Sequence, residues 1–433
     1  MSRIASEKKK PTGNHAVTEA PPTKGQQAGA HSSHKNAEAK TQKSRVAANG
    51  KSGNNFPNVL VHGFCGWGRE TLTSKIYHYF GGTGDIQEYL NNRGYQTFTA
   101  AVGPLSSNWD RACELYYFLK GGVVDYGAVH SARYGHERYG RSYPGVFPEW
   151  SEQHKVHLIG HSMGGPTIRT LVQLLEHGDP DEIAFAPSSR EAGTSELFKG
   201  GKQWVHSITS IAGVNNGTPV ADDLGEPMSD LLLSLASLCG ADNRDLLFDF
   251  DLKQWGIHRE KGEDLVEYAK KIMLSKAWKT TDSAIYDLSF AAARLQNIWV
   301  KTSPHTYYAS YCADGTVPGL ADTRVPMSNM NPLLLGGGAA LGLNERDLAG
   351  GFLNWRPNDG CVPVPSAQYP IGHAHEFVGD NPAHPPKKGV WYVHPPIAGV
   401  DHIGIVQPVG STTLEWLEEF FGKIAAYNKA LPI

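Results

Sequence analysis

Apolar runs and amphipathic segments alternate along most of the chain. Residues 58–61 and 156–160 form short, largely apolar and β-branched runs, which are typical of strands buried on both faces. After residue 162, large apolar side chains recur at helical spacing, at Ile168, Leu171, Leu174 and Leu175. Between these runs, residues 84–96 have helical spacing and residues 97–102 are strand-like. This alternation predicts an α/β fold with a mostly parallel central sheet flanked by helices.

The first 55 residues depart from this pattern. They are rich in Lys, Ala, Ser, Gly, Asn and Pro, nearly lack large apolar side chains, and carry consecutive lysines at 8–10. Such a segment buries too little surface to offset the entropy lost on ordering. We therefore expect a disordered polar and basic tail over 1–55 and one enlarged domain over 56–433. A localisation signal or a tether to an anionic surface is the alternative role for the tail.

The strand-like run and the helical pattern meet at Gly160-x-Ser162-x-Gly164. A strand that turns sharply into a helix around Gly-x-Ser-x-Gly is the nucleophile elbow of the α/β-hydrolase fold. The glycines are needed because so tight a turn leaves no room for Cβ atoms beside the serine. In a chain with 48 glycines the string alone could arise by chance, so its strand-to-helix context carries the prediction. Ser162 is therefore the candidate nucleophile.

A His-Gly turn follows the first predicted strand, at residues 62–63. In α/β-hydrolases this position supplies half of the oxyanion hole, since a tetrahedral intermediate needs two backbone N–H groups aimed at its charged oxygen. The natural donors are the backbone amides of Phe64 and of Met163, the residue after the nucleophile. The alternative is that Gly63 and Gly66 only make a turn.

A serine nucleophile needs an imidazole base, and the base needs a carboxylate to hold its tautomer. In this fold the chain order is serine, acid, histidine. Asp359, in a Pro-Asn-Asp-Gly turn, and His402, in a loop before the last predicted helix (412–427), fit that order. Four other histidines of the same region compete for the role of base: His373, His375, His384 and His394.

Longer blocks of sequence accompany these motifs. Residues 62–70 read HGFCGWGRE and residues 102–114 read VGPLSSNWDRACE. With them the chain resembles the zinc-containing bacterial lipases of thermophilic bacilli and staphylococci, from about residue 59 to residue 402. Further matching blocks lie at 124–128, 139–145, 249–256, 278–289, 303–308, 358–360 and 388–391. The resemblance implies a serine ester hydrolase, most directly a triacylglycerol lipase, with Ser162, Asp359 and His402 as its triad and a lipid–water interface as its working surface.

The resemblance also implies a structural zinc. In these lipases, residues at four positions bind it, and in this chain they are Asp110, His130, His136 and Asp282. Four protein ligands make a closed, tetrahedral site. The two histidines are six residues apart and do not share a helix face, so the sequence alone does not single them out among nineteen. We expect residues 121–148 to form an ordered loop insertion, not a core element, pinned by the zinc.

Two stretches depart from the resemblance. Residues 403–408, after the candidate base, are shorter than in these lipases and lack the carboxylates that help to bind calcium there, which argues against calcium at this position. Residues 313–351 match poorly, and we interpret Gly336-Gly337-Gly338 within them only as flexible. The apolar segment 224–242 matches the position of the helical lid. Its alternative is a core helix.

Composition limits the other possibilities. A net charge of −3 argues against nucleic acid as a partner. Since no apolar run is long enough to span a bilayer or to act as a secretory leader, a cytoplasmic protein or one peripheral to membranes or lipid droplets is expected, with secretion as the alternative. The five scattered cysteines predict mostly reduced thiols, a single disulfide being the alternative.

No organic cofactor is implied. A phospholipase, galactolipase or acyltransferase would share every residue named above, and an inactive lipid-binding relative is the alternative outside the enzymes.

Overall fold

The computed structural model describes residues 53–70, 77–185, 193–223, 249–343, 353–379 and 386–433. The chain divides after Gly50, and all that follows concerns the unit 51–433. The predicted lid, 224–242, lies outside the described residues, as does nearly all of the predicted tail, 1–55. Both stay predictions.

A parallel sheet of seven strands forms the centre of the domain, in the order β11-β12-β7-β6-β5-β1-β2. Every neighbouring pair in it runs parallel. The predicted α/β architecture on a mostly parallel sheet is thereby confirmed. The strands are β1 Asn58–Val61, β2 Thr97–Thr99, β5 Val156–His161, β6 Val205–Ile211, β7 Tyr307–Tyr311, β11 His375–Phe377 and β12 Trp391–Val393.

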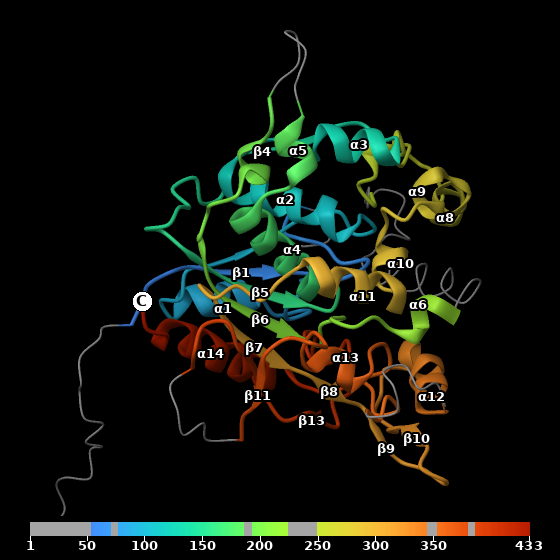
Figure 1. Cartoon of the computed structure of the whole chain (residues 1–433). Coiled ribbons are helices and arrows are strands. Elements are labelled where there is room, and N and C mark those ends of the chain that lie inside the picture. Colours follow the sequence, from blue (N-terminus) through green and yellow to red (C-terminus); the bar gives the residue numbers. More distant parts are fainter. Residues whose placement is uncertain (1–52, 71–76, 186–192, 224–248, 344–352, 380–385) are drawn as a thin grey trace, which may run out of the picture. The chain divides into compact units, whose positions relative to one another are not determined.

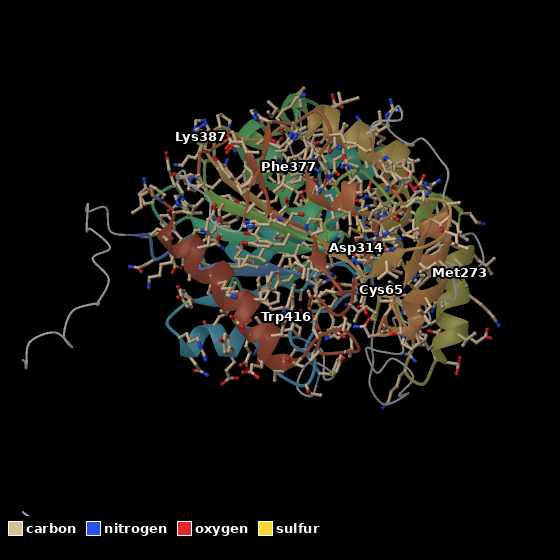
Figure 2. The ribbon with its side chains drawn as sticks, turned by 90° about the horizontal axis from the view of Figure 1, so that it is seen from below. Cys65, Met273, Asp314, Phe377, Lys387 and Trp416 are labelled. Carbon is tan, nitrogen blue, oxygen red and sulfur yellow. The ribbon has the colours of Figure 1, made fainter. Side chains whose placement is uncertain are left out.

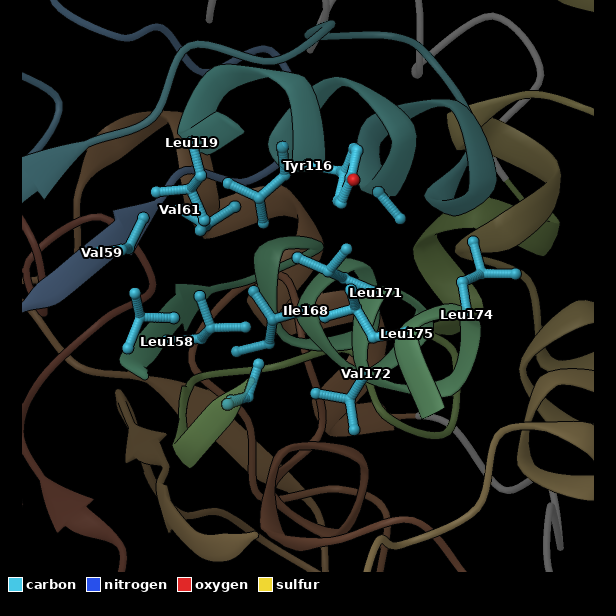
Figure 3. Packing of buried hydrophobic residues seen from close by; sticks show 14 of the residues in the cluster. Val59, Val61, Tyr116, Leu119, Leu158, Ile168, Leu171, Val172, Leu174 and Leu175 are labelled. Carbon is cyan, nitrogen blue, oxygen red and sulfur yellow. The ribbon is translucent and has the colours of Figure 1, made fainter. Parts of the chain in front are cut away.

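Helices cover both faces of this sheet (Figure 1). On one face α2 (Asn108–Lys120) and α4 (Gly164–His177) pack on a cluster that includes Val59 and Val61 of β1. Figure 3 shows this cluster from close by. The intervening Leu60 belongs to the cluster on the opposite face, under α1 (Ile86–Asn92) and α14 (Leu414–Ala430). Successive side chains of a strand point to opposite faces, so a strand buried on both must be apolar throughout.

The C-terminal helix closes the second face. Figure 2, seen from below, shows α14 with Trp416 running across the domain. At the end of this helix, the Asn54 side chain donates to the carbonyl oxygens of Asn428 at 2.8 Å and Leu431 at 3.1 Å. Packed structure therefore begins no later than Asn54. No helix within the described ranges is both long and apolar enough to cross a membrane.

Shorter elements lie around this core. The remaining helices are α3 Ala128–Tyr134, α5 Pro180–Ala184, η2 Glu196–Lys199, α6 Pro219–Asp223, η3 Lys253–Trp255, α8 Leu265–Leu274, α9 Lys276–Lys279, α10 Ala284–Asp287, α11 Phe290–Trp299, η4 Pro332–Leu334, α12 Leu335–Leu343 and α13 Val364–Gln368. The two-stranded pieces pair β3 Gly122–Asp125 with β4 Tyr139–Tyr143, β9 Thr316–Pro318 with β10 Arg324–Pro326, and β8 Ala313–Asp314 with β13 Ile397–Ala398. Cys65, Cys113, Cys312 and Cys361 are free thiols, and Cys239 lies outside the described residues.

The insertion 121–148 is more structured than expected. It forms the antiparallel ribbon β3–β4 with α3 between its strands. Val124, Tyr126, Tyr143 and Phe147 are buried in the main core cluster, so the prediction that the segment adds no core element was wrong. Its elements are too short to show a clear periodicity, which is why the sequence pattern missed them.

The glycine-rich stretch was also misread. Gly336, Gly337 and Gly338 lie in helix α12 and not in a flexible loop. A Cβ on Gly337 would lie 2.4 Å from the carbonyl oxygen of Gly360, the residue after the candidate acid. Glycine is therefore present because the helix backbone approaches this turn so closely.

Candidate active site and candidate metal centre

The elbow forms where β5 turns into α4 at the carboxyl edge of the sheet. Ser162 has φ +56°, a left-handed conformation that residues with a Cβ adopt at a cost. The flanking glycines have steric reasons: a Cβ on Gly160 would lie 2.4 Å from the Gly164 carbonyl oxygen, and one on Gly164 2.3 Å from that of Val61. The strained turn thus holds the serine hydroxyl at the ligand-binding edge.

Ser162, His402 and Asp359 are brought together by hydrogen bonds. His402 Nδ1 lies 2.7 Å from Asp359 Oδ2, and His402 Nε2 lies 2.9 Å from Ser162 Oγ. A carboxylate only accepts, so Nδ1 carries the proton and Nε2 accepts from the serine hydroxyl. This is the arrangement in which an imidazole can remove the serine proton. It joins residues 240 positions apart in the chain.

The carboxylate of Asp359 makes its hydrogen bonds with groups of the protein. Asp359 is fully buried, and its Oδ1 accepts from the backbone amides of Cys361 at 3.0 Å and Val362 at 2.7 Å, which leaves Oδ2 for the imidazole. The His402 amide also donates to the Asp359 carbonyl oxygen at 2.8 Å. Acid and base are therefore positioned by backbone as well as by side chain.

The competing histidines are engaged elsewhere. His373 bonds Thr302 Oγ1 at 2.6 Å, His375 stacks on Tyr369, and His394 stacks on Tyr311. None of these three hydrogen-bonds Ser162. His384 lies outside the described residues.

The turn after β1 lies against the nucleophile. A Cβ on Gly63 would lie 2.6 Å from the Ser162 Cβ, so glycine is required for this approach and does more than make a turn. Phe64 and Ser162 line the same pocket. Among the described residues, no group accepts a hydrogen bond from the backbone N–H of Phe64 or Met163. Both amides are thus available to a developing oxyanion, and that role remains a prediction.

A buried hydrogen-bonded chain, which the sequence did not reveal, connects this turn to the base. His161 Nε2 lies 3.0 Å from the His402 carbonyl oxygen and its Nδ1 lies 2.7 Å from the Tyr79 hydroxyl, which accepts from the Gly63 amide at 3.0 Å. Burial and the neighbouring His402 keep the pKa of His161 well below its usual value, so the ring is neutral. It donates through Nε2 and accepts from Tyr79. Only the position of His161 beside Ser162 could have signalled this.

Arg111 supports the same region from beneath. It is fully buried and donates to the carbonyl oxygens of His62 and of Gly103, the latter at 2.7 Å, and to Thr167 Oγ1 of α4 at 3.0 Å. Burial lowers its pKa to about 10, so the guanidinium stays charged at neutral pH. One cation thus joins the turn after β1 to helix α4, which follows Ser162. Arg111 stood in the matching block 102–114 of the sequence, but these contacts were not foreseen.

The pocket above Ser162 is mostly apolar. Around Ser162 and His402 its walls include Trp67, Val220, Leu288, Leu334 and Val362. Such walls fit a hydrocarbon chain.

A second cluster gathers Asp110, His130, His136 and Asp282, from α2, α3, the loop after it and the segment before α10. One ligand atom from each lies within 4.8 Å of the others. His130 Nε2 is 3.5 Å from Asp110 Oδ1 and 3.2 Å from Asp282 Oδ2, and His136 Nε2 is 3.2 Å from Asp282 Oδ2. Two ligand atoms bound to one tetrahedral zinc lie about 3.3 Å apart, so these separations suit such an ion.

The polar atoms of this cluster fit a cation. Asp110 Oδ1, His130 Nε2, His136 Nε2 and Asp282 Oδ2 are buried without a hydrogen-bond partner. Burial and the nearby Asp282 carboxylate raise the pKa of Asp110, a cost that a divalent cation between them would remove.

Neighbouring groups hold these ligands in place. Gln254 Nε2 donates to Asp110 Oδ2 at 3.0 Å, which leaves Oδ1 free. His136 Nδ1 lies 2.8 Å from the Glu137 carbonyl oxygen, which fixes Nε2 as the ligand atom. The Trp109 ring stacks on His130 with 4.6 Å between centroids. Gln254 stood in a matching block of the sequence, but its contact with Asp110 was not foreseen.

Near the position where calcium was argued against, the carboxylate of Asp401 is engaged by backbone amides. Asp401 accepts from the backbone amides of Asn331 at 2.9 Å, Ile403 at 3.1 Å and Gly404 at 2.7 Å. The expectation about calcium stays a prediction.

Comparisons with known proteins place the chain in a family. The family described as "Lipase-like, C-terminal domain" matches residues 54–426. A lipase of Staphylococcus epidermidis is 38% identical over 82% of this chain and 50% of its own length, and lipase 1 of Staphylococcus aureus is 36% identical over 87% and 54%. The chain thus spans about half the length of these curated relatives.

Solved structures agree. EstA of Clostridium botulinum superposes with a TM-score of 0.78 and 38% identity, covering 88% of this chain and 89% of that one. The Staphylococcus hyicus lipase gives 0.74 and 39%, covering 87% and 96%. Lipase 1 of Pelosinus fermentans gives 0.74 and 42%, covering 86% and 99%. The resemblance to staphylococcal lipases is confirmed, and the chain belongs to the family of lipase-like C-terminal domains.

Proposed function

We propose that this domain hydrolyses carboxylic esters, most directly triacylglycerols, through a serine nucleophile and an acyl-enzyme. The observation that carries the proposal is the chain of hydrogen bonds from Asp359 through His402 to Ser162, which ends in an apolar pocket. The family membership and the lipases among the relatives support it.

The proposed chemistry follows from the proton positions. Ser162 Oγ attacks the ester carbonyl while its proton passes to His402 Nε2, and Asp359 stabilises the resulting imidazolium through Nδ1–H. The imidazolium then protonates the leaving alkoxide. In the second half, His402 takes a proton from water, the hydroxide attacks the acyl-enzyme, and the acid is released as Ser162 regains its proton.

The oxyanion is assigned to the amides of Phe64 and Met163. The segment of Phe64 is held by hydrogen bonds from Arg111 and to Tyr79 of the Tyr79–His161 chain. The segment of Met163 is held by its carbonyl oxygen, which accepts from Thr167 at the start of α4. Donors that need no rearrangement stabilise the developing charge most effectively.

We assign zinc to the second cluster. Two imidazoles and two carboxylates suit this ion, and four protein ligands leave no open position for a substrate. Bound there, zinc would supply structural cross-linking. It would join the 121–148 insertion to α2 and to the segment before α10.

The segment 224–242 is proposed as a lid, from its apolar sequence and the resemblance. Helix α6 leads directly into it, and Val220 and Ala221 of α6 line the pocket. A lid at this place would cover the pocket in water and turn towards lipid.

A substrate panel tests the proposal. Purified full chain is assayed on short and long p-nitrophenyl esters, on trioleoylglycerol and on phosphatidylcholine, below and above the concentration at which each forms an interface, with Ser162→Ala as the blank. Hydrolysis of long acylglycerols that rises with the interface supports a lipase. Preference for phosphatidylcholine would make it a phospholipase, acyl transfer to alcohols an acyltransferase, and no turnover of any ester would leave a lipid-binding relative.

A further inference from the structure

Exposed apolar side chains gather beside the pocket. Of the seventeen large hydrophobic residues that are exposed among the described ones, six fall between 317 and 343, in the β9–β10 hairpin and in η4–α12: Val317, Leu320, Val325, Leu333, Leu335 and Leu343. These six are called the apolar rim below. Figure 1 shows the hairpin beneath α12, both in orange, and α12 contacts both β10 and α6.

The β9–β10 hairpin carries two exposed valines on its strands and an exposed leucine next to a strained turn. Antiparallel pairing places Val317 directly opposite Val325. Between them, Ala321 and Asp322 have φ of 50° and 61°, a region that favours glycine. The adjacent Leu320 is 88% exposed. A strained turn that presents a leucine to solvent adds nothing to the core, so its use is sought at the surface.

The charge pattern of this surface favours uncharged lipid. No Lys, Arg, Asp or Glu occurs from residue 325 to residue 343, and α12 reads LGGGAALGL. The one nearby cation of β10, Arg324, is paired with Asp314 at 2.5 Å. Asp322 at the hairpin tip adds a negative charge. An anionic membrane would therefore find no free cation in the described part of the hairpin or α12.

The rim is joined to the active site by backbone contacts. Leu334, between the exposed Leu333 and Leu335, is buried and lines the pocket. The close approach of Gly337 to Gly360 ties α12 to the acid turn, and Asn358 Nδ2 donates to the Gly338 carbonyl oxygen at 3.2 Å. A surface that binds the rim is thus held at a set position relative to the triad.

We propose that the apolar rim docks this domain on the surface of an uncharged lipid phase and holds the mouth of the pocket against it. The proposal rests on the proposed function and adds a docking element separate from the lid. A second copy of the chain is the other possible occupant. It is disfavoured because stable protein interfaces bury about 20–30 residues a side, far more than six.

The test separates docking from catalysis. Leu320→Asp and Leu335→Asp are introduced singly, since the first is at the tip of a turn and an acid at the start of a helix is tolerated by its dipole. Leu295→Asp, on α11, is the matched control, because this leucine is also exposed, at 56%, but lies outside the rim. Partition of the full chain onto trioleoylglycerol emulsion and phosphatidylcholine vesicles is measured in a Ser162→Ala background, so that hydrolysis does not alter the surface. Hydrolysis of soluble p-nitrophenyl acetate is measured with Ser162 present.

Each rim variant is expected to lower partition about tenfold, since a leucine that inserts into lipid gains most of its transfer free energy. Hydrolysis of the soluble ester and partition of Leu295→Asp should stay within about twofold of the parent, and Leu320→Phe should restore partition. Unchanged partition of both rim variants overturns the proposal while leaving the proposed function intact. Absent ester hydrolysis with rim-dependent partition overturns the function and keeps the docking. A dimer in sedimentation that the rim variants abolish would assign the rim to a second copy.

Discussion

The candidate active site and the candidate metal centre are made of the same parts, yet they are completed differently. Both contain buried carboxylate and imidazole groups from distant segments: one of each with a serine hydroxyl in the first, and two of each in the second. In the first, Asp359, His402 and Ser162 satisfy one another at 2.7 and 2.9 Å. In the second, one atom each of Asp110, His130, His136 and Asp282 is buried without a hydrogen-bond partner.

This difference indicates different dependences. The hydrogen bonds of the candidate active site are made between groups of the protein itself and need no bound ion. Its side chains should therefore matter for catalysis and contribute little to the stability of the fold. Four atoms that face one another without a hydrogen-bond partner would be satisfied by a cation, so the candidate metal centre should contribute to stability and little to chemistry. The predictions below test this contrast, from the largest expected effect to the smallest.

Replacing the nucleophile should separate chemistry from folding. Ser162→Ala is expected to lower kcat/KM for p-nitrophenyl esters by about a thousandfold or more, because no nucleophile remains. The melting temperature should change little, since the serine packs no core. Residual activity above about a tenth of the parent would mean that another residue is the nucleophile.

Removing the metal should have the converse effect. The purified protein should contain about one zinc per chain, and a chelator should lower the melting temperature by at least about 5 °C while activity on a soluble ester persists below that temperature. His130→Ala should lose the ion to a mild chelator, whereas His154→Ala, at an exposed histidine, should retain it. Metal-free native protein, or melting indifferent to chelator, would contradict the assignment.

Buried imidazoles at two places in the domain should make the fold sensitive to acid. Burial lowers the pKa of His62 to about 3 and that of His206 to about 4, from an ordinary value of 6.5. The unfolded chain therefore binds protons between pH 6.5 and these values while the folded chain does not. As the pH is lowered through this window, the free energy of unfolding should decrease by about 1 kcal/mol per pH unit for each ring.

Urea denaturation at several pH values measures this slope. His206→Asn should flatten it by one ring's share. Equal stability at pH 7 and pH 4.5 would show that these rings are protonated in the folded protein.

The smallest effect is expected beneath the oxyanion turn. Tyr79→Phe removes the hydroxyl that joins the Gly63 amide to His161 and should lower kcat about tenfold with little change in KM, because it positions groups that act in the transition state. Tyr77→Phe is the matched control, a second tyrosine hydroxyl nearby, which bonds Gln407 Oε1 at 3.0 Å. A KM effect with unchanged kcat would make Tyr79 a residue of the substrate pocket alone.

Local patterns of the sequence determined the sheet and the identity of the main candidates. Apolar runs at 58–61 and 156–160 predicted buried strands, because side chains alternate between the two faces of a strand and a strand buried on both faces is apolar throughout. Gly160, Ser162 and Gly164 could be interpreted because a tight turn leaves few residue types that fit. The chain order of serine, acid and histidine, together with the resemblance to the lipases, selected Ser162, Asp359 and His402, which the fold brings within hydrogen-bond distance.

The tertiary structure alone decided what depends on close approach between distant segments. Gly336, Gly337 and Gly338 resembled a flexible loop, and only the close approach of α12 to Gly360 explains why the helix carries a glycine at position 337. The elements of 121–148 are too short to be periodic and are defined by packing on α2. The links from Tyr79 to His161 and from Gln254 to Asp110 connect residues 82 and 144 positions apart. No local sequence pattern predicts such a hydrogen bond, because the two residues meet only after the sheet has formed and brought their segments together.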